Sequence, residues 1–335
     1  MSQQRILDLF QGAGATLVQA DILQPAEVLL DLYGEDIRGR AYVTHDPLCG
    51  ELMLRPDFTV PVVQRHMDEQ SEPARYCYAG PVFRQQDFDA QRPSEHIQVG
   101  FEVFDRGDAA AVEAEVFKLF LNAVDADVPL IVGDVGLLIA AVIGLDTSDA
   151  RKAALLRHVW RPTRFKALLE RFSTTVSAPV VAIGGPPIGL RSDADVADRS
   201  AQLAAEASAN PIPENQVNAL LALLAVEVDF HAVTDAMTPL FADLPTLEAA
   251  CGKIDARVDA FGEALQDMPV ITFRATYGLS AMEYYDGFVF GLLNPADLDG
   301  PPLASGGRYD ALTRVLGKGR EVPAVGGIVR LELLP

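Results

Sequence analysis

The order of strand-like and helix-like segments constrains the fold of this chain more than any other feature of its sequence. Two strand candidates, Arg75–Val82 and Glu95–Phe104, follow each other with only a polar loop between them, and elsewhere strands and helices alternate irregularly. A parallel, doubly wound sheet requires regular strand–helix–strand repeats. We therefore predict an α+β fold built on an antiparallel sheet of six or seven strands that is flanked by helices.

A change of composition sets residues 146–225 apart. Ala-rich helical segments that carry Arg and Lys follow one another there, and the turns Gly184–Pro187 and Pro211–Pro213 separate them. We predict a helical insertion at about residues 146–225, within a single domain that spans residues 1–335. A long helix over roughly Pro245–Leu265 should follow the insertion.

The most apolar stretch, Val128–Leu145, is long enough to raise the question of a membrane span. Asp134 and three glycines interrupt it. We instead predict a buried strand over Pro129–Val132 and a buried helix over Val135–Ile143, and we expect no membrane partner.

The charge and the cysteines narrow the class of protein further. Asp and Glu number 47 against 27 Lys and Arg, a formal net charge of −20, and such a surface repels phosphate backbones. Cys49, Cys77 and Cys251 lie far apart, without a CxxC pair or a Cys/His cluster. The N-terminus lacks the pattern of a secretory signal. We expect a cytoplasmic protein without a nucleic-acid partner, a metal or a cofactor.

Three short polar motifs follow one another in the first third of the chain. Leu54–Thr59 places Asp57 in the first turn of a predicted helix, where an acid is common. Arg84 ends a predicted strand before a polar loop. Gln98 and Glu102 share one face of the next strand, about 14 Å apart. Taken alone, each motif has an ordinary structural explanation, such as a solvated sheet face.

Taken together, the three motifs resemble motif 2 of the histidyl-tRNA synthetase family, a class II aminoacyl-tRNA synthetase family. Ala281–Gly287 stands where that family has Gly-Leu-Asp-Tyr-Tyr, Gly306–Asp310 is its GGRYD, and Val325–Pro335 resembles its last motif, Gly-Leu-Glu-Arg. The segment around Pro25 resembles motif 1. The resemblance covers roughly residues 5–145 and 245–335. It implies a class II synthetase-like antiparallel sheet, dimerisation through the Pro25 region, and a helical insertion between the two matching parts.

The resemblance also implies a pocket for free L-histidine. The family uses the acid and the threonine near the α-amino group, the glutamine and the glutamate at the amino group and the imidazole, and the second tyrosine to close on the ring. A carboxylate suits imidazole because it orients the ring N–H and favours its charge. The candidate binding residues are Asp57, Thr59, Gln98, Glu102, Tyr284 and Tyr285.

The nucleotide side departs from the family pattern. Arg84 keeps the motif 2 arginine, and Arg92 stands for the loop arginine. Gln86 replaces an acid, Ser280 replaces the arginine that opens the Tyr-Tyr segment, and Leu333 replaces the arginine of the last motif. Each lost cation can supply on the order of several kcal/mol of transition-state stabilisation, which neither serine nor leucine can provide. We predict a chain without catalytic residues that still binds histidine.

This combination resembles the synthetase paralogues that serve as regulatory subunits of ATP phosphoribosyltransferase, the first enzyme of histidine biosynthesis. The resemblance implies a hetero-oligomer without an anticodon-binding domain. In it, the chain activates a short catalytic subunit and conveys feedback inhibition by histidine.

Several alternatives stay open. An active or truncated histidine-adenylating enzyme is opposed by Ser280 and Leu333. A nucleic-acid-binding module is opposed by the net charge of −20. A fold without any ligand is opposed by the complete set of pocket residues. Histidine could also act elsewhere, for example at the subunit interface.

Overall fold

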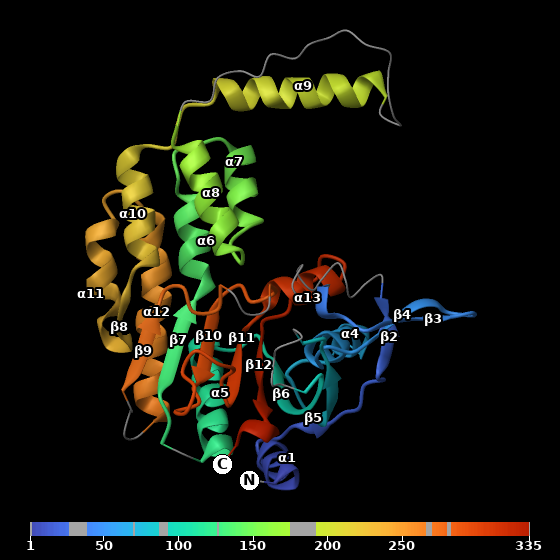
Figure 1. Ribbon diagram of the computed structural model, residues 1–335. Helices are drawn as coiled ribbons and strands as arrows, with labels where there is room; N and C mark the ends of the chain where they lie inside the picture. Colours follow the sequence, from blue (N-terminus) through green and yellow to red (C-terminus); the bar gives the residue numbers. More distant parts are fainter. Residues whose placement is uncertain are drawn as a thin grey trace.

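The computed structural model describes residues 2–26, 39–69, 71–86, 93–125, 127–174, 192–265, 270–279 and 283–334. Within them, a nine-stranded sheet forms the centre of the molecule (Figure 1), in the order β1-β5-β6-β12-β11-β10-β7-β9-β8. Its strands are β1 Thr16–Leu17, β5 Ala74–Phe83, β6 Glu95–Phe104, β7 Leu130–Asp134, β8 Glu227–Asp229, β9 Ile271–Arg274, β10 Phe288–Leu292, β11 Ala304–Arg308 and β12 Ala324–Arg330.

The predicted antiparallel sheet is confirmed, but its predicted size was too small. Neighbouring strands run antiparallel except for two parallel pairs, β1 with β5 and β7 with β9. The edge strands β1 and β8 contain only two and three residues. So few side chains cannot display the alternation by which a strand is recognised, and β8 was therefore not predicted.

Three helices cover one face of the sheet. The helices α1 Gln3–Gly12 and α5 Ala109–Val124 pack directly on the strands, and α12 Thr246–Ala264 packs against α5. Val99, Phe101 and Val103 of β6 point into this layer, where they share one core with Phe117 of α5. Each fully buried side chain of this kind contributes roughly 1.5–3 kcal/mol.

The opposite face of the sheet carries a second core. The helices α4 Thr59–Glu69 and α13 Asp310–Leu316 pack against each other there, beside the three-stranded sheet β2-β4-β3. Its strands are β2 Leu23–Pro25, β3 Val43–Asp46 and β4 Gly50–Leu54. This second core leaves part of the sheet face uncovered, and the cavity described below lies on that part.

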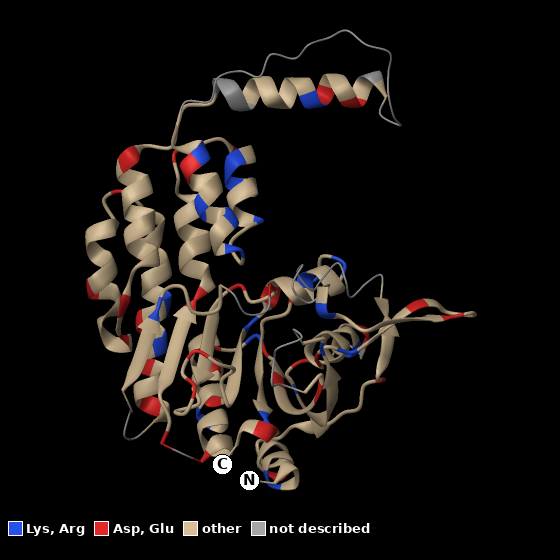
Figure 2. Cartoon of the chain, in the orientation of Figure 1, with Lys and Arg blue, Asp and Glu red and all other residues tan. Residues whose placement is uncertain are grey.

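The described residues between 146 and 225 are helical, as predicted. They form α7 Asp149–Leu156, α8 Pro162–Phe172, α9 Asp193–Ser208 and α10 Glu214–Leu224. Figure 1 shows α7, α8 and α10 together beyond one end of the sheet, with α9 set apart from them. Lys and Arg outnumber Asp and Glu on α7 and α8, whereas Asp and Glu are spread over the whole molecule (Figure 2).

The apolar stretch before this region contains β7 and the helix α6 Val135–Ile143, which confirms the predicted strand and helix. No helix of the described residues is both long enough and apolar enough to cross a membrane. The remaining short elements are η1 Phe230–Ala232, α11 Val233–Met237, η2 Thr238–Leu240 and η3 Leu331–Leu333.

Candidate functional site

A cavity of about 510 Å³ lies on the face of the sheet opposite α5. The alternation along β6 explains the position of the cavity. Val99, Phe101 and Val103 point into the core beneath α5, so the residues that alternate with them point to the cavity side. The predicted polar face of this strand is therefore buried rather than solvated. Most of the sequence-predicted site residues line this one cavity: Asp57, Thr59, Arg84, Gln98, Tyr284 and Tyr285.

One end of the cavity presents hydrogen-bond acceptors. Asp57 and Gln98 are 3% and 2% exposed, and the Tyr284 hydroxyl lies 3.5 Å from an Asp57 carboxylate oxygen. The Gln98 Oε1 atom is buried and accepts no hydrogen bond from any described group. A buried acceptor without a partner costs about 1–3 kcal/mol, so this atom marks a place where a ligand donor would stabilise the protein.

Glu102 lies beneath this end rather than in its wall. Its side chain is fully buried, and its carboxylate accepts hydrogen bonds from the hydroxyls of Thr59 at 2.9 Å, Tyr78 at 2.8 Å and Tyr309 at 2.6 Å. Burial raises the pKa of Glu102 to about 7, although the three hydroxyl donors favour the charged form. Thr59, which also lines the cavity, connects the carboxylate to the ligand space.

Tyr78 and Tyr309, whose hydroxyls donate to this carboxylate, were not predicted from the sequence. Tyr78 lies opposite Gly100 in the β5–β6 pair, and a Cβ at Gly100 would fall 2.2 Å from the tyrosine ring. The glycine of the Gln-x-Gly-x-Glu motif therefore makes room for the ring whose hydroxyl holds Glu102. The conspicuous Gly100 between two polar residues was the signal that could have revealed this arrangement.

The Tyr-Tyr segment is held from the helical region. The rings of Tyr284 and Tyr285 are 5.0 Å apart, and the backbone oxygen of Tyr285 accepts a 2.9 Å hydrogen bond from the Trp160 indole. Arg161, the next residue, donates two 3.2 Å hydrogen bonds to the Glu283 carboxylate. The start of α8 and the wall of the cavity are thus joined by three polar contacts.

Arginines line the cavity next to these acceptors, in a part called here its arginine end. Arg84 donates from Nε to the Pro56 carbonyl at 3.0 Å, and Arg330 donates from Nη1 to the Pro302 carbonyl at 2.8 Å and to the Ser305 hydroxyl at 3.1 Å. Burial, followed by the charge of Arg84, lowers the pKa of Arg330 to about 10. Within the described ranges, neither arginine forms an ion pair with a carboxylate.

A smaller cavity of about 160 Å³ adjoins the arginine end and contains His96. Burial lowers the pKa of His96 to about 4, and the nearby charges of Arg84, Arg330 and Arg40 lower it further. This part of the protein therefore has a positive potential that disfavours an additional cation and favours an anion.

Two positions that depart from the family pattern, Leu333 and Gln86, lie in the described part of the chain, and both line the smaller cavity. Leu333, in η3, lines the smaller cavity and offers no donor. Gln86 also lines it and accepts a 2.9 Å hydrogen bond from Arg40. Arg92 and Ser280 lie outside the described residues. Arg330 was not predicted from the sequence; it occupies the glycine position of the family's Gly-Leu-Glu-Arg.

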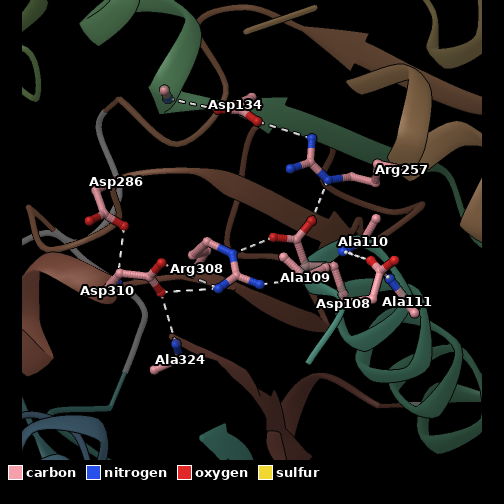
Figure 3. Close-up of polar contacts among 12 residues, drawn as sticks. Asp108, Ala109, Ala110, Ala111, Asp134, Arg257, Asp286, Arg308, Asp310 and Ala324 are labelled. Carbon is pink, nitrogen blue, oxygen red and sulfur yellow. Dashed lines mark hydrogen bonds and ion pairs between the residues drawn. The ribbon is translucent and has the colours of Figure 1, made fainter. Parts of the chain in front are cut away.

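The GGRYD motif supports the cavity from behind through a buried ionic network (Figure 3). Arg308 and Arg257 both donate to Glu113 of α5, and Arg257 also contacts Asp134 at 3.0 Å. Arg308 reaches Asp310 at 3.1 Å. These contacts join β7, β11, α5, α12 and α13, so Arg308 acts on the frame of the site.

Asp286 extends the same network toward the Tyr-Tyr segment (Figure 3). It accepts backbone hydrogen bonds from Asp310 at 3.1 Å and Ala311 at 2.7 Å, at the start of α13. Burial and the charge of Asp310 raise the pKa of Asp286 to about 7. Because Asp286 directly follows Tyr285, the position of this tyrosine depends on the network.

The described residues contain neither a candidate metal site nor a disulfide. Among them, no three His, Cys, Asp or Glu side chains are grouped so that they could hold a metal ion. Cys49, Cys77 and Cys251 form no disulfide.

Comparison with known proteins identifies the family of the chain. The family model for histidyl-tRNA synthetase matches residues 1–183 and 195–334, and the chain therefore belongs to the histidyl-tRNA synthetase family. Among its relatives are the ATP phosphoribosyltransferase regulatory subunits of Brucella canis and Brucella suis. Each is 28% identical over 351 residues, which cover 96% of this chain and 92% of the relative.

Solved structures confirm the predicted class II synthetase-like fold. An ATP phosphoribosyltransferase regulatory subunit/histidyl-tRNA synthetase from Bacillus halodurans matches with a TM-score of 0.69 and 20% identity, over 99% of this chain and 77% of the other. Histidyl-tRNA synthetase from Nostoc sp. matches with a TM-score of 0.63 and 15% identity, over 99% and 68%.

Proposed function

We propose that this protein is a non-catalytic regulatory subunit of ATP phosphoribosyltransferase. It activates a short catalytic subunit in the first step of histidine biosynthesis and contributes to feedback control by L-histidine. The observation that carries the proposal is the contrast between two adjoining cavities: the larger one is lined by the residues expected for an amino acid, whereas the smaller one contains Leu333 at the last-motif position for nucleotide charge. The names of the Brucella relatives support the regulatory role.

Histidine binds with its ammonium group between Asp57 and Gln98, where the unpartnered Oε1 atom accepts a hydrogen bond. The imidazole packs against Tyr285 and over Thr59. Glu102 acts on the ring through the buried hydroxyls, because its own carboxylate lies behind them. This arrangement modifies the direct contact that the family resemblance implied for Glu102.

Binding alone does not inhibit a partner. Histidine must favour one arrangement of the hetero-oligomer over another, because a ligand shifts an equilibrium only through its different affinities for the two states. The hydrogen bonds of Trp160 and Arg161 to the Tyr-Tyr segment offer a route from the cavity to the helical region. The chain self-associates as a dimer through the region of Pro25 and acts in the cytoplasm without nucleic acid.

Co-expression with a short catalytic subunit of the same organism tests the proposal. The two chains should elute together on size-exclusion chromatography, and the catalytic subunit should turn over faster in the complex. Histidine should then reduce that rate. A catalytic subunit whose turnover and oligomeric state are the same with and without this chain would refute the regulatory role.

A histidine-adenylating enzyme remains the second candidate, because Arg84 lines the cavity at the position of the motif 2 arginine. Its test is histidine-dependent exchange of pyrophosphate into ATP by the purified chain. We expect no exchange, since Leu333 provides no positive charge. Detectable exchange that disappears in Arg84→Ala would establish the enzyme instead.

A further inference from the structure

The cavity presents two neighbouring sets of side chains of opposite polarity, and the proposed function uses only one of them. Asp57 and the Gln98 carbonyl oxygen form the acceptor end, and Arg84 and Arg330 form the donor end. A free α-amino acid carries the complementary pair of groups, an ammonium and a carboxylate on one carbon atom. The acceptors therefore suit the ammonium group of the ligand, and the arginines suit its carboxylate.

We propose that Arg330 binds the α-carboxylate of the amino acid whose ammonium group lies at Asp57 and Gln98. Arg330 is then a specificity-determining residue, which selects the zwitterionic amino acid over analogues without the carboxylate. The inference rests on the proposed function in that L-histidine is the ligand.

The register of the sheet places the two contacts side by side. Arg330 of β12 lies directly opposite Gln98 of β6 in an antiparallel pair. Side chains at opposed positions lie on the same face, with Cβ atoms about 4.5–5.5 Å apart. Adjacent donor and acceptor side chains suit the ammonium and carboxylate groups, because these are adjacent in the ligand.

Gln98 provides the independent sign of a ligand. The side chain is 2% exposed and lines the cavity, yet its Oε1 atom has no partner among the described groups. Buried amide oxygens are almost always hydrogen-bonded in native proteins. An ammonium group at this place would satisfy the atom and would bring the ligand's carboxylate next to Arg330.

Arg330 is held in position by uncharged groups and forms no ion pair among the described residues, while the charge of Glu332 favours its protonated form from a distance. Its described hydrogen bonds use Nη1 alone, to a carbonyl and a hydroxyl that carry no charge. A guanidinium has five N–H donors in a planar fork that fits a carboxylate with two parallel bonds. Arg84 lines the same cavity and disfavours the Arg330 charge, so an anion between the two arginines would relieve their repulsion.

Arg330 adds a positive charge near the nucleotide side, where the family pattern has lost two arginines. The cationic groups expected at positions 280 and 333 are absent, as Ser280 and Leu333 show. Arg330 supplies one positive charge from β12, at a position where the family has glycine. It serves a carboxylate without restoring the arginine that the last motif needs for ATP.

Calorimetric titration of the full chain can test this assignment with three probes: L-histidine, L-histidinol, in which CH₂OH replaces the carboxylate, and inorganic phosphate. The wild-type protein should bind histidine about 10- to 150-fold more tightly than histidinol, the range of a charge-assisted hydrogen bond. Arg330→Gln should lose most of this preference and should bind histidinol almost as well as the wild type. Arg330→Lys, which keeps the charge without the fork, should retain part of it.

Arg274→Gln is the matched control. Arg274 lines the same cavity, but its guanidinium is bound to Glu227 by hydrogen bonds of 2.9 and 3.0 Å. This variant should keep the full preference for histidine. Circular dichroism melting curves identify any variant that fails to fold, and Arg330→Lys then carries the test.

The outcomes separate the two proposals. Wild-type protein that binds no histidine refutes histidine binding in this cavity. Histidine binding with an unchanged preference in Arg330→Gln and Arg330→Lys overturns the role of Arg330 alone. Phosphate that competes with histidine in the wild type but not in Arg330→Gln, with the histidine preference unchanged, assigns Arg330 to a free phosphate and overturns the carboxylate assignment.

Discussion

The two ends of the cavity lie on the same sheet, yet they follow the family pattern to different degrees. At the acceptor end, Asp57, Gln98 and Glu102 occupy every expected position, and buried hydroxyls support the glutamate. At the arginine end, Arg330 and Leu333 replace a glycine and an arginine. Under the proposed function, the chain binds histidine without activating it, because amino-acid binding and charge stabilisation depend on separate side chains with separate supports.

The largest expected effect comes from breaking the frame that both ends share. Glu113→Ala leaves Arg257 and Arg308 buried without their common carboxylate, which should lower the free energy of unfolding by about 3–5 kcal/mol. Glu115→Ala on the same helix removes only a partly exposed ion pair with Arg75, worth about 0–1 kcal/mol. Urea denaturation measures both variants, and equal losses would contradict a structural role of the network.

The next effect concerns the acceptor end alone. Glu102→Gln keeps the shape and removes the charge that holds the Thr59, Tyr78 and Tyr309 hydroxyls, so the affinity for histidine should fall by up to about 10- to 150-fold, the range of a direct charge-assisted hydrogen bond. Glu95→Gln, at an exposed position of the same strand, should leave the affinity unchanged. Calorimetry decides, and unchanged histidine binding in Glu102→Gln would remove this pocket from feedback control.

Gly100→Ala tests the support of that carboxylate. The added Cβ would lie 2.2 Å from the Tyr78 ring, so the ring must move and the free energy of unfolding should drop by about 1–3 kcal/mol. Histidine affinity should fall as well, because Tyr78 donates to Glu102. Gly252→Ala has open space around it and serves as control. Unchanged histidine affinity in Gly100→Ala would show that the position of the Tyr78 ring does not affect binding.

The smallest effect concerns the arginine end and depends on pH. The pKa of His96 is about 4 in the folded protein, below its usual 6.5, so the unfolded chain binds more protons between these values. The contribution of His96 to stability is complete above pH 6.5 and decreases as the pH falls toward 4. Near pH 5 the decrease should be about 1–2 kcal/mol.

His96→Gln should reduce that dependence, while a variant of the exposed His45 should keep it. Glu102 acts in the opposite direction, because its raised pKa of about 7 lowers stability as the pH rises from 4.5 to 7. The difference between wild type and variant, measured by denaturation across this range, therefore isolates His96. Identical curves would show that neither burial nor the arginines lower the pKa of His96 in the folded protein.

Some of the site could be predicted because its signals are local. The alternation of Gln98 and Glu102 with Val99, Phe101 and Val103 separates the polar from the apolar face of β6. The aromatic supports could not be predicted, since Tyr309 reaches Glu102 from a distant part of the chain. Nor did the sequence show that Glu102 lies beneath the cavity, because burial depends on how the layers pack.

The sequence by itself determined the antiparallel α+β class, the helical character of the middle region and the candidates for the pocket, six of which line one cavity. These follow from periodicities and motifs that each occupy one short segment. Only the tertiary structure decided that Arg330 lies opposite Gln98 and that Arg84 shares their cavity. The pairing of strands from opposite ends of the chain depends on the register of the whole sheet, which no local pattern specifies.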